Sequence, residues 1–220
     1  MTQCDLYFIS GSPPCWSVML AMEAKGLDYT PKRLDNAKRE QKSSEFLKIN
    51  PRGQVPVLTN GSVIVCETLA ILSYLDAIRP DPPLFGSTPE ETARIWQVIC
   101  ECDGALRDPV GDISRPLFRG KGEEFAEQIS NAAALVREEL ALLDSRVSSQ
   151  LWLAGEELSA ADLIVFPVVM QLCRAAAREE AIPLELGVYP LSEYFPNLDA
   201  WSKRIEALDG FNNAYPPHWK

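Results

Sequence analysis

Apolar runs and turn residues alternate along the first 80 positions in a pattern that predicts a strand, a helix and a second strand. Residues 5–9 have the character of a short buried strand, and the turn residues at 10–14 follow it. Ser12 is a suitable helix N-cap, and apolar residues then recur at helical spacing as far as Gly26. A second strand is predicted at 29–34. Two strands joined by a helix should be parallel, with a right-handed crossover.

The next segment predicts a hairpin and another helix. After a short helix expected near 44–49, Asn60-Gly61 separates two β-branched runs within residues 55–65, which indicates a two-residue hairpin. Leucines at helical spacing then predict a helix that ends before Pro80. We therefore expect residues 1–79 to form an α/β domain with a four-stranded mixed sheet and three helices.

The second half of the chain has a different pattern, typical of helices alone. Residues 80–89 hold four prolines and a glycine, the composition of a stiff linker. Capping boxes are expected at 88–91 and 159–162, and the second precedes an apolar stretch suited to the middle of a helical bundle. We predict a domain at 1–79, a linker at 80–89 and an all-α domain at 90–220.

Composition and charge narrow the possible partners. Apolar residues make up 46% of the chain and charged residues 24%, which is ordinary for a globular protein. No apolar run is long enough to span a membrane, and the N-terminus lacks a secretory signal pattern, so a cytoplasmic protein is expected. The net charge of −10 argues against a nucleic-acid partner. Residues 1–80 carry nine basic and eight acidic groups, so an anionic small ligand meets less repulsion there than in the acidic remainder.

The cysteines and the histidine limit the chemistry. The six cysteines have irregular spacing and no histidine near them, so we expect buried reduced thiols and no metal site. His218 is the only histidine and lies close to the end of the chain. A Ser-His-Asp or Cys-His mechanism would have to recruit it from there. The chemistry is therefore expected to work without a histidine base.

Four motifs, in order along the chain, carry a family resemblance. Residues 10–15 (SGSPPC) resemble the active-site loop of the serine-type cytosolic glutathione transferases, the theta, delta and zeta classes. Residues 50–58 resemble that family's cis-proline loop, 67–71 the start of its glutamyl-binding helix, and 159–162 the capping box of its sixth helix. The resemblance extends over essentially the whole chain. It implies a thioredoxin-like N-terminal domain that binds glutathione and an all-α domain that binds an electrophile.

The resemblance also implies where glutathione binds. The backbone of Val55 would pair with the cysteinyl backbone beside a cis Pro56, although proline could also simply begin the hairpin's first strand. Glu67 would face the ligand's ammonium. Thr68 and the helix N-terminus would face its carboxylate, although an ordinary helix cap would look the same. For the glycyl carboxylate, the family positions correspond to Lys42 and Gln54, with Gln41 ranked behind them.

Thiol activation is assigned to a single hydroxyl. A free thiol has a pKa of about 8.5, and lowering it by about 2 units takes roughly 2.7 kcal/mol. One hydrogen bond to a charged acceptor contributes about 1.5–3 kcal/mol. Ser12 is the predicted donor, with Ser10 and Tyr7 as alternatives, and Ser12 could also be merely an N-cap.

Two neighbours of Ser12 bear on this assignment. Trp16 stands where the serine classes often carry arginine, so the charge balance near the first helix differs. Cys15 follows Ser12 at thioredoxin-like spacing. Ser12 cannot form a mixed disulfide, which favours conjugation over thiol–disulfide reduction. We expect Cys15 to be buried, whereas an exposed Cys15 with a lowered pKa would favour reductase chemistry.

We therefore predict a homodimeric glutathione transferase that joins the glutathione sulfur to a small hydrophobic electrophile. The electrophile pocket is expected between the domains, near the 9–12 loop and residues 106–118, with Tyr215 and Trp219 as a possible cover. Glu101 or Asp103 is expected to reach the partner's ligand. The alternatives are a glutathione-dependent isomerase, reductase or dehalogenase, or a non-catalytic glutathione-binding protein.

Overall fold

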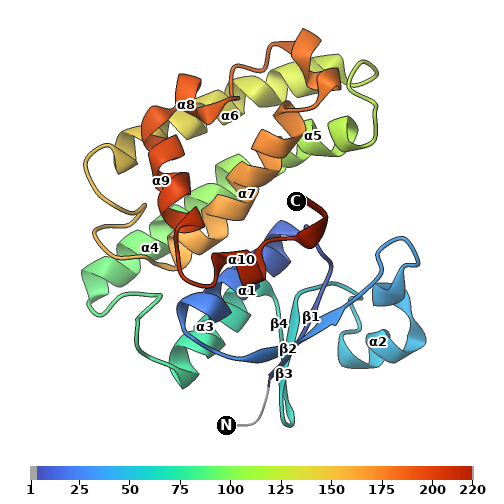
Figure 1. Cartoon of the computed structure of the whole chain (residues 1–220), viewed down its shortest axis with the longest axis vertical. Helices are drawn as coiled ribbons and strands as arrows, with labels where there is room; N and C mark the ends of the chain where they lie inside the picture. Colours follow the sequence, from blue (N-terminus) through green and yellow to red (C-terminus); the bar gives the residue numbers. More distant parts are fainter. Residues whose placement is uncertain (1–3, 220) are drawn as a thin grey trace. The chain divides into compact units, whose positions relative to one another are not determined.

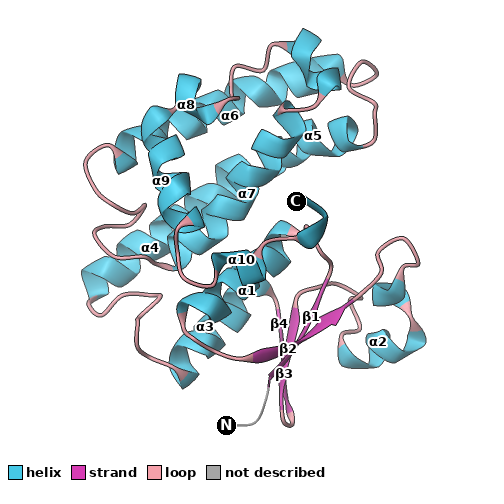
Figure 2. Cartoon of the chain, viewed as in Figure 1, coloured by secondary structure: helices cyan, strands magenta, loops and turns pink. Residues whose placement is uncertain are grey.

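The computed structural model describes residues 4–219, which divide into two compact units. The first contains the chain up to Phe85 together with the segment from Ala207, and the second is Gly86–Glu206. Strands are confined to the first unit apart from an isolated bridge between Trp152 and Gly155 (Figure 2). The end of the chain thus returns to the unit in which it begins.

The first unit is built on a four-stranded mixed sheet, as predicted. Its strands are β1 (Cys4–Phe8), β2 (Tyr29–Arg33), β3 (Val57–Asn60) and β4 (Val63–Cys66), in the order β2-β1-β3-β4. β1 is parallel to β2 and antiparallel to β3, and β3 is antiparallel to β4. Helix α1 (Pro13–Ala24) connects the parallel pair, so the predicted strand-helix-strand unit is confirmed.

The hairpin between β3 and β4 has the predicted two-residue loop. Asn60 pairs with Val63, which leaves Gly61 and Ser62 as the loop residues. Gly61 has a φ of 62°, in the left-handed region that glycine enters at little cost. The Asn-Gly signal therefore marked the turn, with asparagine as the last paired residue rather than a loop residue.

Four helices accompany this sheet. They are α1, α2 (Ser44–Ile49), α3 (Thr68–Ile78) and α10 (Phe211–Ala214), and a short 3-10 segment, Glu40–Lys42, precedes α2. Helix α1 packs against both α3 and α10 (Figure 1). Tyr7 of β1 contacts Phe46 of α2 with ring centroids 5.7 Å apart. Side chains alternate along a strand, so the side chains of Leu6 and Phe8 point to one face of the sheet and that of Tyr7 to the other. Helix α2 therefore covers the face to which Tyr7 points.

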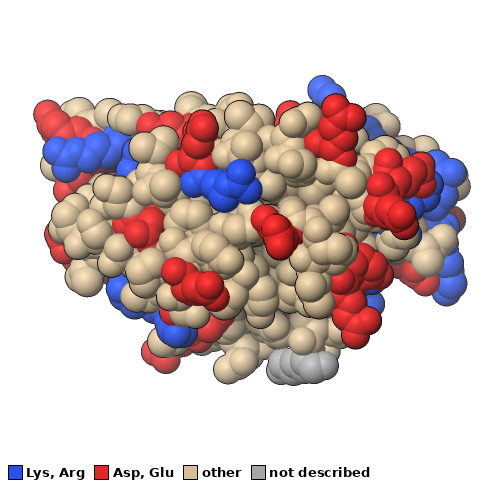
Figure 3. All heavy atoms as spheres, turned by 90° about the horizontal axis from the view of Figure 1, so that it is seen from above, with Lys and Arg blue, Asp and Glu red and all other residues tan. Residues whose placement is uncertain are grey.

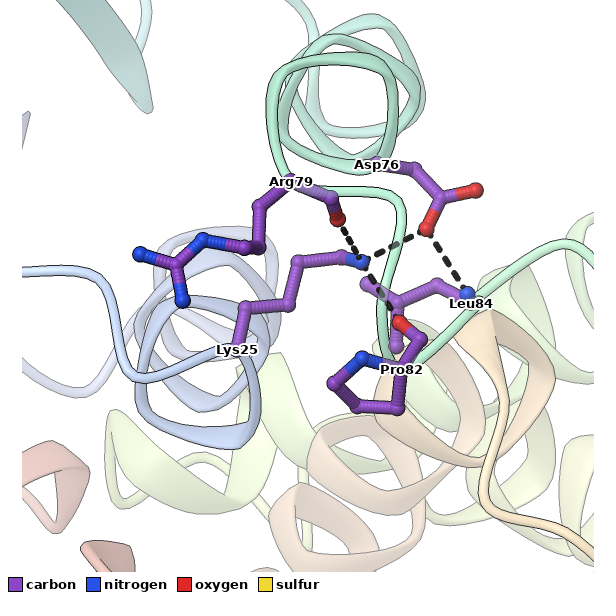
Figure 4. A network of polar contacts seen from close by, with 5 residues as sticks. All are labelled: Lys25, Asp76, Arg79, Pro82 and Leu84. Atoms are coloured by element: carbon purple, nitrogen blue, oxygen red, sulfur yellow. Dashed lines mark hydrogen bonds and ion pairs between the residues drawn. The ribbon is translucent and has the colours of Figure 1, made fainter.

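A buried lysine ties the end of α1 to the end of α3 (Figure 4). The side chain of Lys25 is 0% exposed and its Nζ lies 2.7 Å from Asp76 Oδ1. Nζ also donates to the carbonyls of Arg79 and Pro82, each at 2.6 Å. Asp76 Oδ1 in turn accepts from the N–H of Leu84 at 2.8 Å. The network fixes the chain where it leaves α3.

The second unit is helical, as predicted. Its helices are α4 (Pro89–Glu101), α5 (Arg107–Phe118), α6 (Ala126–Val147), α7 (Ala160–Ala176), α8 (Leu191–Tyr194) and α9 (Pro196–Glu206), with a 3-10 segment at Glu179–Leu184. A five-residue π-helical turn, Cys102–Leu106, connects α4 to α5. Helix α7 packs against α4 and α5 and is buried along most of its length.

The predicted capping boxes open α7 and α4. Ser159 and Asp162 bond reciprocally at the start of α7, and the fully buried carboxylate of Asp162 also accepts from Trp201 Nε1 at 2.9 Å. At α4 the Thr88 hydroxyl accepts from the N–H of Glu91, whereas the Glu91 carboxylate accepts from the N–H of Ser87. The capping box at 159–162 is therefore complete. In the box at 88–91, the Glu91 carboxylate bonds to the N–H of Ser87 instead of that of Thr88.

None of the helices in the described part of the chain has the length and apolar composition that a membrane span requires. On the face drawn in Figure 3, acidic and basic side chains are interspersed between broad uncharged areas.

We predict that Lys25→Met lowers the free energy of unfolding by about 3 kcal/mol, because it leaves a partly buried carboxylate and two carbonyls without their donor. Lys38→Met is the control. Lys38 pairs with Asp35 at the surface, with side chains 74% and 43% exposed, so this change should cost less than about 0.5 kcal/mol. Urea denaturation of both variants measures the difference, and equal losses would contradict the role of the network.

Candidate active site

A cavity of about 450 Å³ in the first unit brings together seven of the predicted binding residues. It lies among the start of α1, the 3-10 segment before α2, the loop before β3 and the start of α3. The predicted residues that line it are Gln41, Lys42, Gln54, Val55, Pro56, Glu67 and Thr68. Asn50, which the sequence did not single out, lines it as well. We call this cavity the groove.

One side of the groove is the loop that precedes β3, and Asn50 holds its shape. Asn50 is buried; its Nδ2 donates to the carbonyl of Gln54 at 2.8 Å and its Oδ1 accepts from the N–H of Arg52 at 3.1 Å. The Val55–Pro56 peptide bond is cis, as the resemblance implied. An asparagine before proline predicts only a helix end, so the clamping role of its side chain was not visible in the sequence.

Gly53 lets Lys42 lie across this loop. Lys42 Nζ donates to the carbonyl of Arg52 at 2.8 Å. Gly53 has a φ of 58°, and a Cβ there would come within 2.7 Å of both the Lys42 Cδ and the carbonyl oxygen of Gln41. Only a residue without a side chain allows the lysine stem to lie this close to the backbone. The ammonium is thereby held at the edge of the groove.

The start of α3 forms the opposite side of the groove. Glu67 precedes the helix with a φ of 71°. Residues other than glycine rarely adopt a positive φ, and those that are held in such a conformation cluster at ligand sites. The hydroxyl of Thr68 donates to the carbonyl of Pro14 at 3.5 Å, which joins the first turns of α3 and α1. The free N–H groups of α3 are a favourable place for a carboxylate.

Ser12 lies at the N-terminus of α1 but does not cap it. It occupies the N-cap position, yet its side chain makes no bond to the helix backbone. Its hydroxyl interacts with the thiol of Cys15, one turn along the helix, and lowers the pKa of that thiol. Ser12 lines a second cavity of about 480 Å³ rather than the groove itself, and Ile9 lines both cavities. The predicted thiol donor therefore lies in the cavity next to the groove, and Ile9 is shared by the linings of the two cavities.

The two alternative donors are placed differently. Ser10 Oγ lies 3.1 Å from His218 Nδ1. Tyr7 contacts Phe46 and is absent from the described residues that line either cavity. Of the three candidate hydroxyls, that of Ser12 is the one at a helix N-terminus, where the dipole adds to the stabilisation of an anion.

The end of the chain forms part of the second cavity, which lies beside α1 and the β2 edge of the sheet. Trp16 of α1 is the centre of an aromatic cluster, with centroids 5.2 Å from Trp219, 5.8 Å from Tyr215 and 6.1 Å from Phe211. Trp16, at a position that is often arginine in the serine classes, therefore anchors the C-terminal segment. That packing brings His218 to the loop before α1, which the sequence pattern did not predict.

Cys15 has the environment of an inert thiol. It is buried, and burial raises its pKa to about 11 although the bond from Ser12 lowers it. Burial likewise raises the pKa values of Cys102 and Cys173, each to about 12. Cys100 is exposed. Within residues 4–219 no group of three or more His, Cys, Asp or Glu side chains is arranged to hold a metal ion.

We expect Cys15 to resist alkylation at neutral pH. With a pKa of about 11, roughly one Cys15 thiol in ten thousand is a thiolate at pH 7, and the thiolate is the reactive form. Treatment with iodoacetamide followed by peptide mass spectrometry should label Cys100 first, with Cys15 reacting as the pH approaches 11. Labelling of Cys15 at neutral pH as fast as Cys100 would contradict this environment.

Comparisons with known proteins identify the family of the chain. The family model for the glutathione S-transferase N-terminal domain matches residues 2–77, and that for the C-terminal domain matches residues 106–209. The chain is 30% identical over 216 residues to glutathione S-transferase A of Pleuronectes platessa, covering 96% of this chain and 90% of that protein. It is 28% identical to maleylacetoacetate isomerase of Rattus norvegicus over 215 residues, 96% of this chain and 91% of the relative.

A solved structure of a glutathione S-transferase from the Antarctic clam Laternula elliptica superposes with a TM-score of 0.84 at 29% identity. The match covers 99% of this chain and 94% of the clam protein. The family is established by the two domain models together with the Pleuronectes platessa relative, which is 30% identical over 90% of its own length. The chain belongs to the glutathione S-transferase family.

Proposed function

We propose that the protein joins the sulfur of glutathione to a small hydrophobic electrophile, with Ser12 as the donor that holds the sulfur as a thiolate. The observation that carries the proposal is the groove. One cavity gathers a cis-proline loop, a lysine and a helix N-terminus, and Ser12 lines the neighbouring cavity, which shares Ile9 with the groove. These are the groups that an extended zwitterionic tripeptide with a thiol would need.

Each part of glutathione has a place in this groove. The N–H and C=O of Val55 pair with the cysteinyl backbone, as an added edge strand would. The γ-glutamyl carboxylate meets the N-terminus of α3 and Thr68, and its ammonium meets Glu67. The glycyl carboxylate meets Lys42 and Gln54, with Gln41 beside them. The groove thereby presents a cation or N–H groups to each carboxylate and a carboxylate to the ammonium.

The chemistry then needs one hydrogen bond to sulfur. The thiol proton leaves to solvent, and the Ser12 O–H donates to the thiolate that remains. A bond to a charged acceptor contributes about 1.5–3 kcal/mol and a helix N-terminus about 0.3–1, which together are enough to lower the thiol pKa by about 2 units. The thiolate attacks the electrophilic carbon, the carbon–sulfur bond forms, and the leaving group departs with the bonding pair. Ser12 is never deprotonated.

The second cavity supports a hydrophobic co-substrate. Phe8, Met19, Pro216 and Pro217 give it apolar walls close to Ser12. An aryl halide is therefore a suitable first test substrate. The similarity to maleylacetoacetate isomerase makes glutathione-dependent cis–trans isomerisation the second candidate, whereas the buried Cys15 argues against a disulfide reductase.

A homodimer and a cytoplasmic location complete the proposal, and both rest mainly on the family. The exposed edge strand β4 supports the dimer, because Val63 is 42% and Ile64 50% exposed on it. Exposed apolar residues on an unpaired edge are a common feature of protein interfaces. Glu101 and Asp103, the residues considered for a contact across the dimer, bond to Arg146 and Arg107 within their own unit.

We predict that Ser12→Ala raises the pKa of the glutathione thiol in the complex by about 2 units, toward the free value. At neutral pH kcat for an aryl halide should fall by about tenfold to a hundredfold, with KM for glutathione within about threefold, because the groove contacts remain. Ultraviolet titration of the thiolate and steady-state kinetics measure both. Ser73→Ala, an exposed change on α3, is the control. A thiol pKa unchanged in Ser12→Ala would refute the assignment.

Gly53→Ala should weaken glutathione binding by displacing Lys42. The new Cβ meets the lysine stem and the Gln41 carbonyl at 2.7 Å, so KM for glutathione should rise by about tenfold with little change in kcat. Gly61→Ala is the matched control. Its φ of 62° is similar to the 58° of Gly53, yet a Cβ there meets nothing within 4 Å. Equal effects of both changes on KM would show that backbone strain, and not Lys42, matters.

A further inference from the structure

The only histidine of the chain contacts the loop that carries Ser12. Ser10 Oγ and His218 Nδ1 lie 3.1 Å apart although they are 208 positions apart in the sequence. Ser10, Gly11 and Ser12 are consecutive, so this contact lies two residues from the proposed thiol donor. Neither the groove residues nor the mechanism above uses it.

The loop backbone also packs directly against the last residues. Gly11 has a φ of 83°, and a Cβ there would lie 3.0 Å from the Trp219 ring and 3.2 Å from the His218 ring. Trp219 in turn packs edge-on against Trp16, with centroids 5.2 Å apart and planes at 80°. The His218 ring is therefore held between the loop and a cluster anchored on α1.

The loop has two backbone bonds at Ser12. The N–H of Ser12 donates to the carbonyl of Ile9 at 3.2 Å, and its carbonyl accepts from the N–H of Trp16 at 2.9 Å. Pro13 and Pro14 have no N–H to donate, and the Ser12 side chain makes no bond to the helix backbone. A side-chain contact from outside the loop therefore adds to these backbone bonds in holding the loop that carries Ser12.

We propose that His218 is a positioning residue for thiol activation: through Ser10 and Gly11 it holds the loop so that the Ser12 hydroxyl is aimed at the glutathione sulfur. The inference rests on the proposed function of Ser12. It requires one hydrogen bond at Nδ1, which either partner can donate, and it assigns no proton transfer to the imidazole. The C-terminal segment is thereby part of the site.

Two amide substitutions separate this role from simple packing. In His218→Asn an amide atom takes the place of Nδ1, whereas in His218→Gln it takes the place of Nε2. We expect His218→Gln to lower kcat for an aryl halide by about tenfold, within the hundredfold that a misplacement of about 1 Å can cost. The pKa of the bound thiol should rise by about 1 unit, with KM for glutathione within about twofold. His218→Asn should keep kcat and the thiol pKa close to wild type.

Ser10→Ala supplies the second arm of the test. It should reproduce the losses of His218→Gln, and combining the two changes should add little, because they break the same contact. If His218→Gln does not fold, as judged by thermal denaturation, Ser10→Ala alone carries the test. Full activity in His218→Gln or in Ser10→Ala, equal loss in the Asn and Gln variants, or additive losses would each overturn the proposal.

Failure of the proposed function gives a different result. If the wild-type protein binds no glutathione or leaves its thiol pKa at the free value, the transferase assignment fails whatever the variants do. Amide hydrogen exchange of Gly11 and Ser12 then still reports on the contact. Exchange should be faster in His218→Gln than in His218→Asn, and equal rates would show that His218 does not hold the loop.

Discussion

Ser12 occupies the N-cap position of α1, and the proposed chemistry depends on the proton of its hydroxyl. The side chain makes no cap bond to the helix, and a cap bond would in any case use only the oxygen as acceptor and leave the O–H able to donate. Here the hydroxyl bonds to the buried thiol of Cys15, a weak partner that a thiolate can replace. The position combines the positive end of the helix dipole with a donor, and neither requires a histidine base.

The other residues of the site hold glutathione in reach of that hydroxyl. Asn50 shapes the loop before β3 with two side-chain bonds, and Gly53 gives Lys42 the space to cross it. Thr68 ties the start of α3 to the start of α1. The Lys25 network joins the other ends of the same two helices. The groove and the donor are thus parts of one rigid frame within the first unit.

The sequence predicted the features that local signals specify. The strand-helix-strand unit, the hairpin at Gly61 and the capping box at Ser159 depend on spacing and turn chemistry, and all three are confirmed. The residues predicted to bind glutathione come from separate motifs, and the fold brings them together in the lining of one cavity. The π-helical turn at Cys102–Leu106 was missed, because its apolar spacing is close to that of an ordinary helix.

The contacts that sequence reasoning missed join distant positions. Asn50 acts through side-chain bonds that form only once the loop has turned. The Ser10–His218 contact depends on the packing of the chain's end against Trp16, which no local pattern encodes. A crystal structure with glutathione bound tests the central claim most directly. The account predicts the Ser12 Oγ within about 3.5 Å of the glutathione sulfur. A sulfur that contacts a different side chain, with Ser12 still bonded to Cys15, would contradict it.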